Sequence, residues 1–152
     1  MRKTIRNNEA FYELVWSKLF RFDKYSASRI LTEQSGVIAL MKKNKGKDEY
    51  LLFYACWREG MRVSLKKLMD PLVDRHEEIR AQLDPDNLYY KYTAVETSAN
   101  DLLDIIYWLV KTYQPELNDT SQVKDSGRYM NISVKEREMR EGETIERFFN
   151  PV

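Results

Sequence analysis

Two aspartates, Asp101 and Asp104, stand three residues apart in a stretch whose apolar residues follow a helical pattern. Side chains three apart share one face of a helix, so the two carboxylates could together bind a cation weakly. Asp101 also has a simpler explanation, because it falls in the first turn of a helix that Ser98 can cap.

Other reactive side chains are scarce. The chain has one cysteine, Cys56, and one histidine, His76, which excludes an intramolecular disulfide and the usual Cys/His zinc sites. Cys56 lies beside Trp57 in an apolar run and is expected to be a small core residue. His76 precedes two glutamates and is expected on an exposed helical turn.

Basic residues form the second group that could bind a ligand. Residues 1–47 carry eleven Lys and Arg against four acids, whereas residues 48–152 carry fourteen against twenty. This basic third is either an ordinary solvated face or a surface that contacts phosphates and releases their counterions. The candidate phosphate contacts are Lys18, Arg21, Lys24, Arg29, Lys42, Lys43, Lys45 and Lys47.

Tyrosines are concentrated on the segments expected to be strands. They are either a platform on which nucleic-acid bases stack or the usual cross-strand packing pairs. The residues concerned are Tyr50, Tyr54, Tyr89, Tyr90 and Tyr92.

The elements that must position these groups indicate an α+β fold with a small three-stranded antiparallel sheet in a ββαβα core, flanked by helices. Two β-rich runs, 37–41 and 49–57, are joined by a polar run with Asn44 and Gly46, which predicts a hairpin. The second run has no clean alternation, so we expect a central strand covered on both faces. Helices are predicted over 64–69 and from 71 to about 83, a third strand over 88–97, and a last, deeply buried helix from Ser98 to Pro115.

The flanking segments complete a division into 1–35, 36–118 and 119–152. Phe11, Leu14, Val15 and Leu19 recur at three- and four-residue spacing, which predicts a helix over 9–21 capped by an asparagine. The segment 119–152 is a charged extension with one strand-like island at 129–136 and an aromatic pair near its end.

The order hairpin, helix, strand, helix, together with four local motifs, resembles the GIY-YIG nuclease domain of excinuclease C and of many homing endonucleases. Ser35-Gly36-Val37-Ile38 looks like the family's Pro-Gly-Val-Tyr, and Leu52-Phe53-Tyr54-Ala55 stands where Tyr-Ile-Gly would fall. Ser64-Leu65-Lys66-Lys67-Leu68 resembles Asn-Leu-x-x-Arg. The stretch 109–118, LVKTYQPELN, is similar to Leu-Ile-Lys-x-x-x-Pro-x-x-Asn.

The resemblance implies a degenerate nuclease site. The family's metal-binding glutamate falls on Ile106, which has no ligand oxygen, while Ile38 replaces a tyrosine and Leu68 an arginine. A divergent active site would therefore have to be rebuilt, with Mg²⁺ or Mn²⁺ held at Asp104. Its candidate catalytic residues are Tyr54, Arg58, Arg62, Asp104 and Asn118.

Three functions remain open on the sequence. The favoured one is a DNA- or RNA-binding protein without a cofactor, on a degenerate GIY-YIG-like fold. The alternatives are a divergent metal-dependent endonuclease, and a protein-interaction or structural module that binds a partner or itself through the C-terminal segment. No apolar run approaches the roughly 20 residues that span a bilayer and no secretory signal is evident, so a cytoplasmic location is expected.

Overall fold

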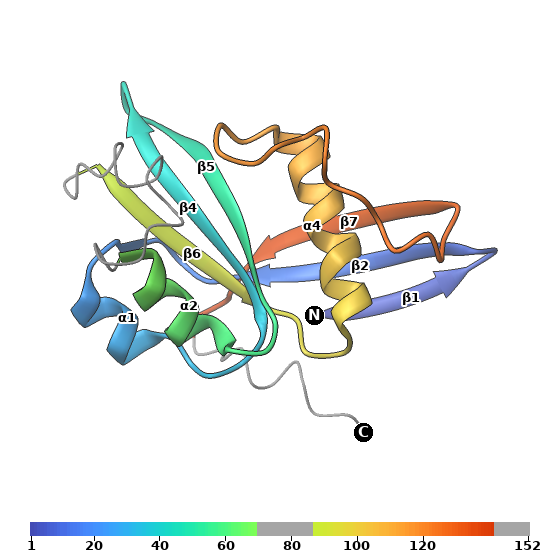
Figure 1. Cartoon of the computed structure of the whole chain (residues 1–152), viewed down its shortest axis with the longest axis horizontal. Helices are drawn as coiled ribbons and strands as arrows, with labels where there is room; N and C mark the ends of the chain where they lie inside the picture. The colour runs from blue at the N-terminus through green and yellow to red at the C-terminus, as the bar shows by residue number, and fades with distance from the viewer. Residues whose placement is uncertain (70–86, 142–152) are drawn as a thin grey trace.

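The computed structural model describes residues 1–69 and 87–141, and it has a mixed α+β fold (Figure 1). Its elements are β1 (Arg2–Arg6), β2 (Glu9–Trp16), β3 (Phe20–Arg21), α1 (Lys24–Ile30), β4 (Gly36–Asn44), β5 (Lys47–Cys56), α2 (Gly60–Met69), β6 (Leu88–Ala94), α4 (Ala99–Tyr113) and β7 (Asn131–Glu138). The helix predicted from 71 to about 83, together with His76, lies outside the described residues.

The larger sheet has four antiparallel strands in the order β3-β6-β4-β5, one more than predicted. The additional strand is the two-residue β3, which is too short to recognise in the sequence. The predicted hairpin is confirmed as β4 and β5. Its two-residue turn, Lys45 and Gly46, has φ angles of 52° and 79°, as a type I′ turn requires.

The two faces of this sheet are covered by different helices. Along the central strand β4, Ile38 and Leu40 pack in the cluster that contains α1 and α2, while Val37 and Ala39 pack in the cluster that contains α4. Because successive strand residues point to opposite faces, the alternation of β4 separates the two cores. Gly36 begins this strand, and a Cβ there would lie 2.2 Å from the carbonyl oxygen of Thr93.

The middle of strand β5, residues 51–53, is buried as predicted, but the strand lies at the edge of the sheet rather than in the centre. The chain after α4 covers its free edge. The Leu117 backbone N–H donates to the carbonyl oxygen of Leu51 at 2.9 Å, and the Asn118 side chain bonds to Phe53. This cover explains why an edge strand can have a continuous apolar run.

The predicted N-terminal helix over 9–21 is wrong, because residues 2–16 form the β1–β2 hairpin. Asn7 and Asn8, expected as caps, have φ angles of 51° and 63° and make its turn. Tyr12, Leu14 and Trp16 are buried and share the inner face of β2. The apolar residues of this segment match both a helical stripe and a two-residue alternation, and pairing with other strands decides in favour of the strand.

The second sheet joins the two ends of the chain, in the order β1-β2-β7. The strand-like island expected at 129–136 becomes β7, which pairs in parallel with β2 from Glu9↔Asn131 to Trp16↔Glu138. Helix α4 lies where the two sheets meet (Figure 1), and its buried residues share a cluster with β2, β4 and β5. Among the described residues, no helix is both long and apolar enough to cross a membrane.

Candidate functional site

The two aspartates lie on the buried side of α4, next to the smaller sheet. Ser98 caps the helix as predicted, and its hydroxyl accepts the backbone N–H of Asp101 at 3.0 Å. The side chain of Asp101 is 4% exposed and that of Asp104 is fully buried. Both carboxylates therefore need internal partners.

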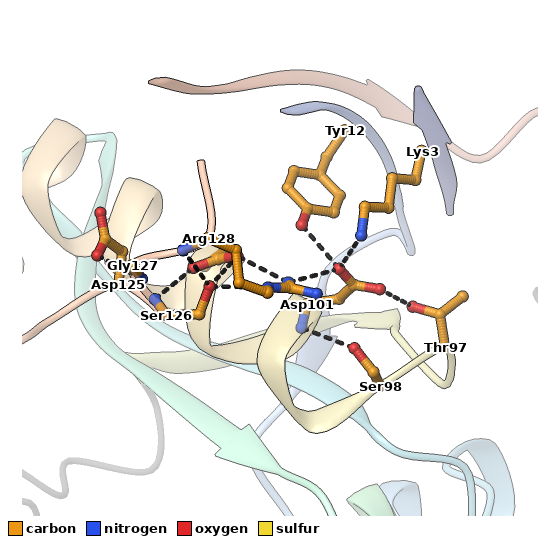
Figure 2. Close-up of polar contacts among 10 residues, drawn as sticks. Lys3, Tyr12, Thr97, Ser98, Asp101, Asp125, Ser126, Gly127 and Arg128 are labelled. Carbon is orange, nitrogen blue, oxygen red and sulfur yellow. Dashed lines mark hydrogen bonds and ion pairs between the residues drawn. The ribbon is translucent and has the colours of Figure 1, made fainter. Parts of the chain in front are cut away.

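Asp101 has four side-chain donors (Figure 2). Its Oδ1 accepts the Lys3 ammonium at 2.6 Å, the Tyr12 hydroxyl at 2.8 Å and the Arg128 guanidinium at 3.0 Å. Its Oδ2 accepts the Thr97 hydroxyl at 2.6 Å. These donors come from β1, β2, the turn before α4 and the loop before β7.

Asp104 is bound by that same loop. The Ser126 backbone N–H and hydroxyl donate to its two oxygens at 2.7 and 2.9 Å, and Arg128 donates at 2.8 Å. We call Lys3, Tyr12, Asp101, Asp104 and Arg128 the carboxylate cluster.

Electrostatics favours the charged forms in this cluster. Burial alone would raise the pKa of Asp101, but the hydrogen bonds from Lys3, Thr97, Tyr12 and Arg128 outweigh it and hold that pKa well below its usual range. Burial works against the charge of Lys3 and of Arg128 too, yet their bonds to the carboxylates raise both pKa values. Burial and the bond to Asp101 raise the pKa of Tyr12, which keeps its hydroxyl a donor.

The cluster is suited to joining elements. Two carboxylates face two cations, and both oxygens of each aspartate accept hydrogen bonds. In the parts of the chain that the structure describes, no three His, Cys, Asp or Glu side chains group as metal ligands would. Asp104, the candidate metal ligand, thus joins α4 to the loop before β7. The neighbouring Asp101 joins α4 to the smaller sheet.

The other candidate catalytic residues lie elsewhere. Tyr54 on β5 packs against the core under α1 and α2. Arg62 on α2 donates from Nε to the Leu31 carbonyl oxygen at 2.8 Å, and Arg58 is exposed after β5. Asp104 belongs to α4, which covers the opposite face of the sheet, so the fold does not bring it together with Tyr54 and Arg62.

Asn118 holds the edge of β5. Its Oδ1 accepts the backbone N–H of Phe53 at 2.7 Å, and its Nδ2 donates to the carbonyl oxygen of Phe53 at 3.0 Å. Glu116, in the same corner, pairs with Lys42 at 2.7 Å. The corner that carries the best match to the nuclease motif therefore binds a strand edge in this protein.

The basic candidates divide into two kinds. Lys42 is paired, whereas Lys43, Lys45 and Lys47 are exposed around the β4–β5 turn and Arg21 is exposed on β3. Lys18 is exposed with its ammonium 5.5 Å from the Phe20 ring centre, Arg29 on α1 contacts Tyr25, and Lys24 is the first residue of α1.

Three strands bring some of these cations to one face. Arg21 pairs with Tyr89, and Tyr89 pairs with Met41, so their side chains share a face. Lys43, two residues beyond Met41, points the same way, and its ammonium lies 4.6 Å from the centre of the Tyr89 ring. Since β3 and β4 flank β6 and Lys43 lies two residues beyond Met41, the Cα atoms of Arg21 and Lys43 are about 12 Å apart. We call Arg21, Lys43, Lys45, Lys47 and Tyr89 the basic edge.

The five strand tyrosines do not form one platform. Tyr90 is fully buried and, with Tyr54 and Tyr92, belongs to the face under α1 and α2. Tyr50 and Tyr89 lie on the other face. Cross-strand packing accounts for Tyr90, whereas Tyr89 lies beside the exposed Lys43.

Sequence reasoning missed Lys91, which lies on the same face as Tyr89. Its ammonium lies 4.7 Å from the ring centre of Trp16 and 5.0 Å from that of Tyr50, and it donates to the Tyr50 hydroxyl at 2.8 Å. Burial lowers its pKa, although the nearby Glu136 and Glu138 act in the opposite direction. The alternation along the strand predicts that Tyr89 and Lys91 share a face. The contact with Trp16 could not be predicted, because Trp16 belongs to β2, which the sequence alone did not identify as a strand.

Cys56 is buried, as expected, and burial raises the pKa of its thiol to about 12. A thiol with this pKa is protonated at neutral pH, which does not suit nucleophilic chemistry.

The architecture is thus a two-sheet α+β unit in which N- and C-terminal strands share one sheet. A family model described as "Uncharacterised protein" matches residues 1–147, and the chain belongs to that family. No curated protein and no solved structure matched the chain. The matched range includes both sheets and the carboxylate cluster.

Proposed function

We propose that this protein binds nucleic acid, contacting the phosphate backbone through the basic edge. The observation that carries the proposal is the position of Lys43 over the Tyr89 ring with Arg21 on the same face of the sheet, next to the exposed Lys45 and Lys47 of the β4–β5 turn. None of these four cations makes an ion pair with any residue between 1 and 69 or between 87 and 141.

Unpaired surface cations are suited to a polyanion. A cation without a carboxylate partner loses no ion pair when it meets a phosphate, and it releases condensed counterions from the nucleic acid. Tyr89 adds an aromatic ring on which a base can stack. The expected likeness to the GIY-YIG fold agrees with this proposal, because β4, β5, α2, β6 and α4 follow one another in the order of that domain.

The proposed role is binding without cleavage. Ile106 stands at the position of the family's metal-binding glutamate, and Asp104 is engaged by Ser126 and Arg128. The proposal therefore assigns no catalytic step and no metal to this chain.

Fluorescence anisotropy with labelled 20-nucleotide DNA and RNA strands, across a salt series, tests the proposal. The Lys43→Gln/Lys47→Gln variant removes two contacts, so the slope of log K against log salt should become shallower by about 1.4 on a single strand. The matched control is Arg6→Gln/Lys124→Gln, two exposed cations on β1 and on the loop after α4. Absence of binding at low salt, or equal slopes in both variants, contradicts the proposal.

A further inference from the structure

The outer face of the smaller sheet, opposite α4, contains a hollow of about 270 Å³. Three neighbouring strands supply its walls and floor. The lining residues are Arg2, Thr4, Phe11, Tyr12, Glu13, Ser133, Val134 and Lys135. None of them belongs to the basic edge, which lies on the other sheet.

One cross-strand row forms an aromatic floor. Phe11 on β2 pairs with Thr4 on β1 and with Ser133 on β7, so its ring lies between two hydroxyl-bearing side chains. The Phe11 side chain remains 39% exposed although its neighbours Ala10 and Tyr12 are buried. An exposed ring at the bottom of a hollow can stack with a flat apolar group.

The next row adds charge. Glu13 pairs with Arg2 on one side and Lys135 on the other, and it accepts Arg137 Nε at 3.3 Å. The side chains of Arg2 and Lys135 are exposed, and neither side chain makes an ion pair or a hydrogen bond with another residue in 1–69 or 87–141. Since Arg137 already neutralises Glu13, the hollow has a net positive rim.

We infer that this hollow binds a small organic anion that contains a flat ring. The ring would lie on Phe11, and the anionic group would accept hydrogen bonds from Arg2 and Lys135. The volume is just below the roughly 300 Å³ at which ordinary ligand pockets begin, so a single ring with one anionic substituent fits better than a larger molecule. The site is independent of nucleic-acid binding at the basic edge.

Titration of the ¹⁵N-labelled full chain with phenyl phosphate, followed by amide chemical shifts, tests the inference. Shifts should concentrate on β1, β2 and β7. Phenyl phosphate should bind about tenfold more tightly than inorganic phosphate or phenol, because each of these supplies only one of the two contacts. Phe11→Ala and Lys135→Gln should each weaken binding at least threefold.

The matched control is Ile5→Ala, which removes an exposed apolar side chain of β1 that is paired with Ala10 and so lies off the hollow. Equal affinity for phosphate and phenyl phosphate, or shifts confined to the β4–β5 turn, overturns the inference. If Phe11→Ala is unfolded, Lys135→Gln decides, because that side chain is exposed. Unchanged affinity in a folded Lys135→Gln also overturns it.

Discussion

The carboxylate cluster and the basic edge differ in how their charges are satisfied. In the cluster, Asp101 and Asp104 are buried and each is bonded to a cation. At the basic edge, cations such as Lys43 and Lys45 are exposed and form no ion pair with any residue in 1–69 or 87–141. The acidic pair has the residue types of a metal-binding site, and the basic run has those of an ordinary solvated surface. Their surroundings favour the opposite roles: the aspartates stabilise the fold, and the lysines are available to bind a ligand.

This difference shows that a side chain's partners, more than its type, decide what it is available to do. A buried carboxylate that already accepts several hydrogen bonds contributes to the fold, and a ligand would have to displace those donors. An exposed ammonium without a partner loses only water and counterions when it binds. Substitutions in the cluster should therefore change stability, whereas substitutions at the edge should change binding.

The largest effect is expected from Asp104→Ala. It leaves Arg128 with one carboxylate partner and Ser126 without its acceptor. Three hydrogen bonds to a fully buried carboxylate are lost, and at about 1 kcal/mol each the free energy of unfolding should fall by about 3 kcal/mol. Urea unfolding followed by circular dichroism measures this loss. The folded variant should bind nucleic acid as the parent protein does, and an unchanged midpoint would contradict the structural role.

Asn118, a predicted catalytic residue, is hydrogen-bonded to the backbone of Phe53. Asn118→Ala measures how much this contact stabilises the fold. The variant loses two hydrogen bonds to Phe53 at the edge of β5, so stability should fall by about 2 kcal/mol. Asn118→Asp keeps the acceptor but places a carboxylate oxygen against the Phe53 carbonyl oxygen, so it should be no more stable than Asn118→Ala at pH 7. An Asp variant as stable as the parent would show that the edge contact has little weight.

The core could be predicted because its signals are local. The turn at Lys45-Gly46, the cap at Ser98 and the alternation over 88–94 each specify an element from a few adjacent residues. The sequence alone was misleading for β2, where one apolar pattern fits two periods. Its parallel partner β7 begins at Asn131, and no local feature of the sequence predicts pairing between strands so far apart along the chain.

The candidate sites were harder to predict because they too depend on contacts between residues far apart in the sequence. Asp101 and Asp104 were recognised as sharing one helix face, but Lys3 and Arg128 reach them from both ends of the chain. The lysines of the hairpin were correctly grouped because they are close in sequence. Their relation to Tyr89 and Arg21 depends on strand order.

A smaller effect than that of Asp104→Ala is expected from pH, because protonating Asp101 cancels its charge but leaves the side chain in place. Its pKa is lowered in the folded protein, chiefly by Lys3 against the effect of burial, so its charge stabilises the fold above the unfolded pKa of about 3.9. That contribution is lost as pH falls below this value. The difference in unfolding free energy between the parent and Asp101→Asn should therefore shrink between pH 6 and pH 3; a constant difference would contradict the pairing.

Arg21→Gln extends the comparison across the basic edge. Arg21 lies on β3, on the far side of β6 from Lys43, and it should contribute one phosphate contact. Affinity for a single strand should fall about threefold and the salt slope should become shallower by about 0.7. Arg6→Gln is the matched control. If Arg21→Gln behaves like this control, the interface is confined to the hairpin turn.

The smallest effect is expected at an exposed ion pair, where the contribution of pairing to stability can be measured without that of burial. Glu59 and Lys67 form an ion pair whose side chains are 49% and 44% exposed, unlike the buried acids of the cluster. If pairing alone determined stability, Glu59→Gln would resemble the cluster variants. Exposed pairs are screened by water and salt, so we expect a loss of less than about 0.5 kcal/mol. Urea unfolding at low and high salt measures it; a loss approaching that of Asp104→Ala would mean that burial is not what makes the cluster structural.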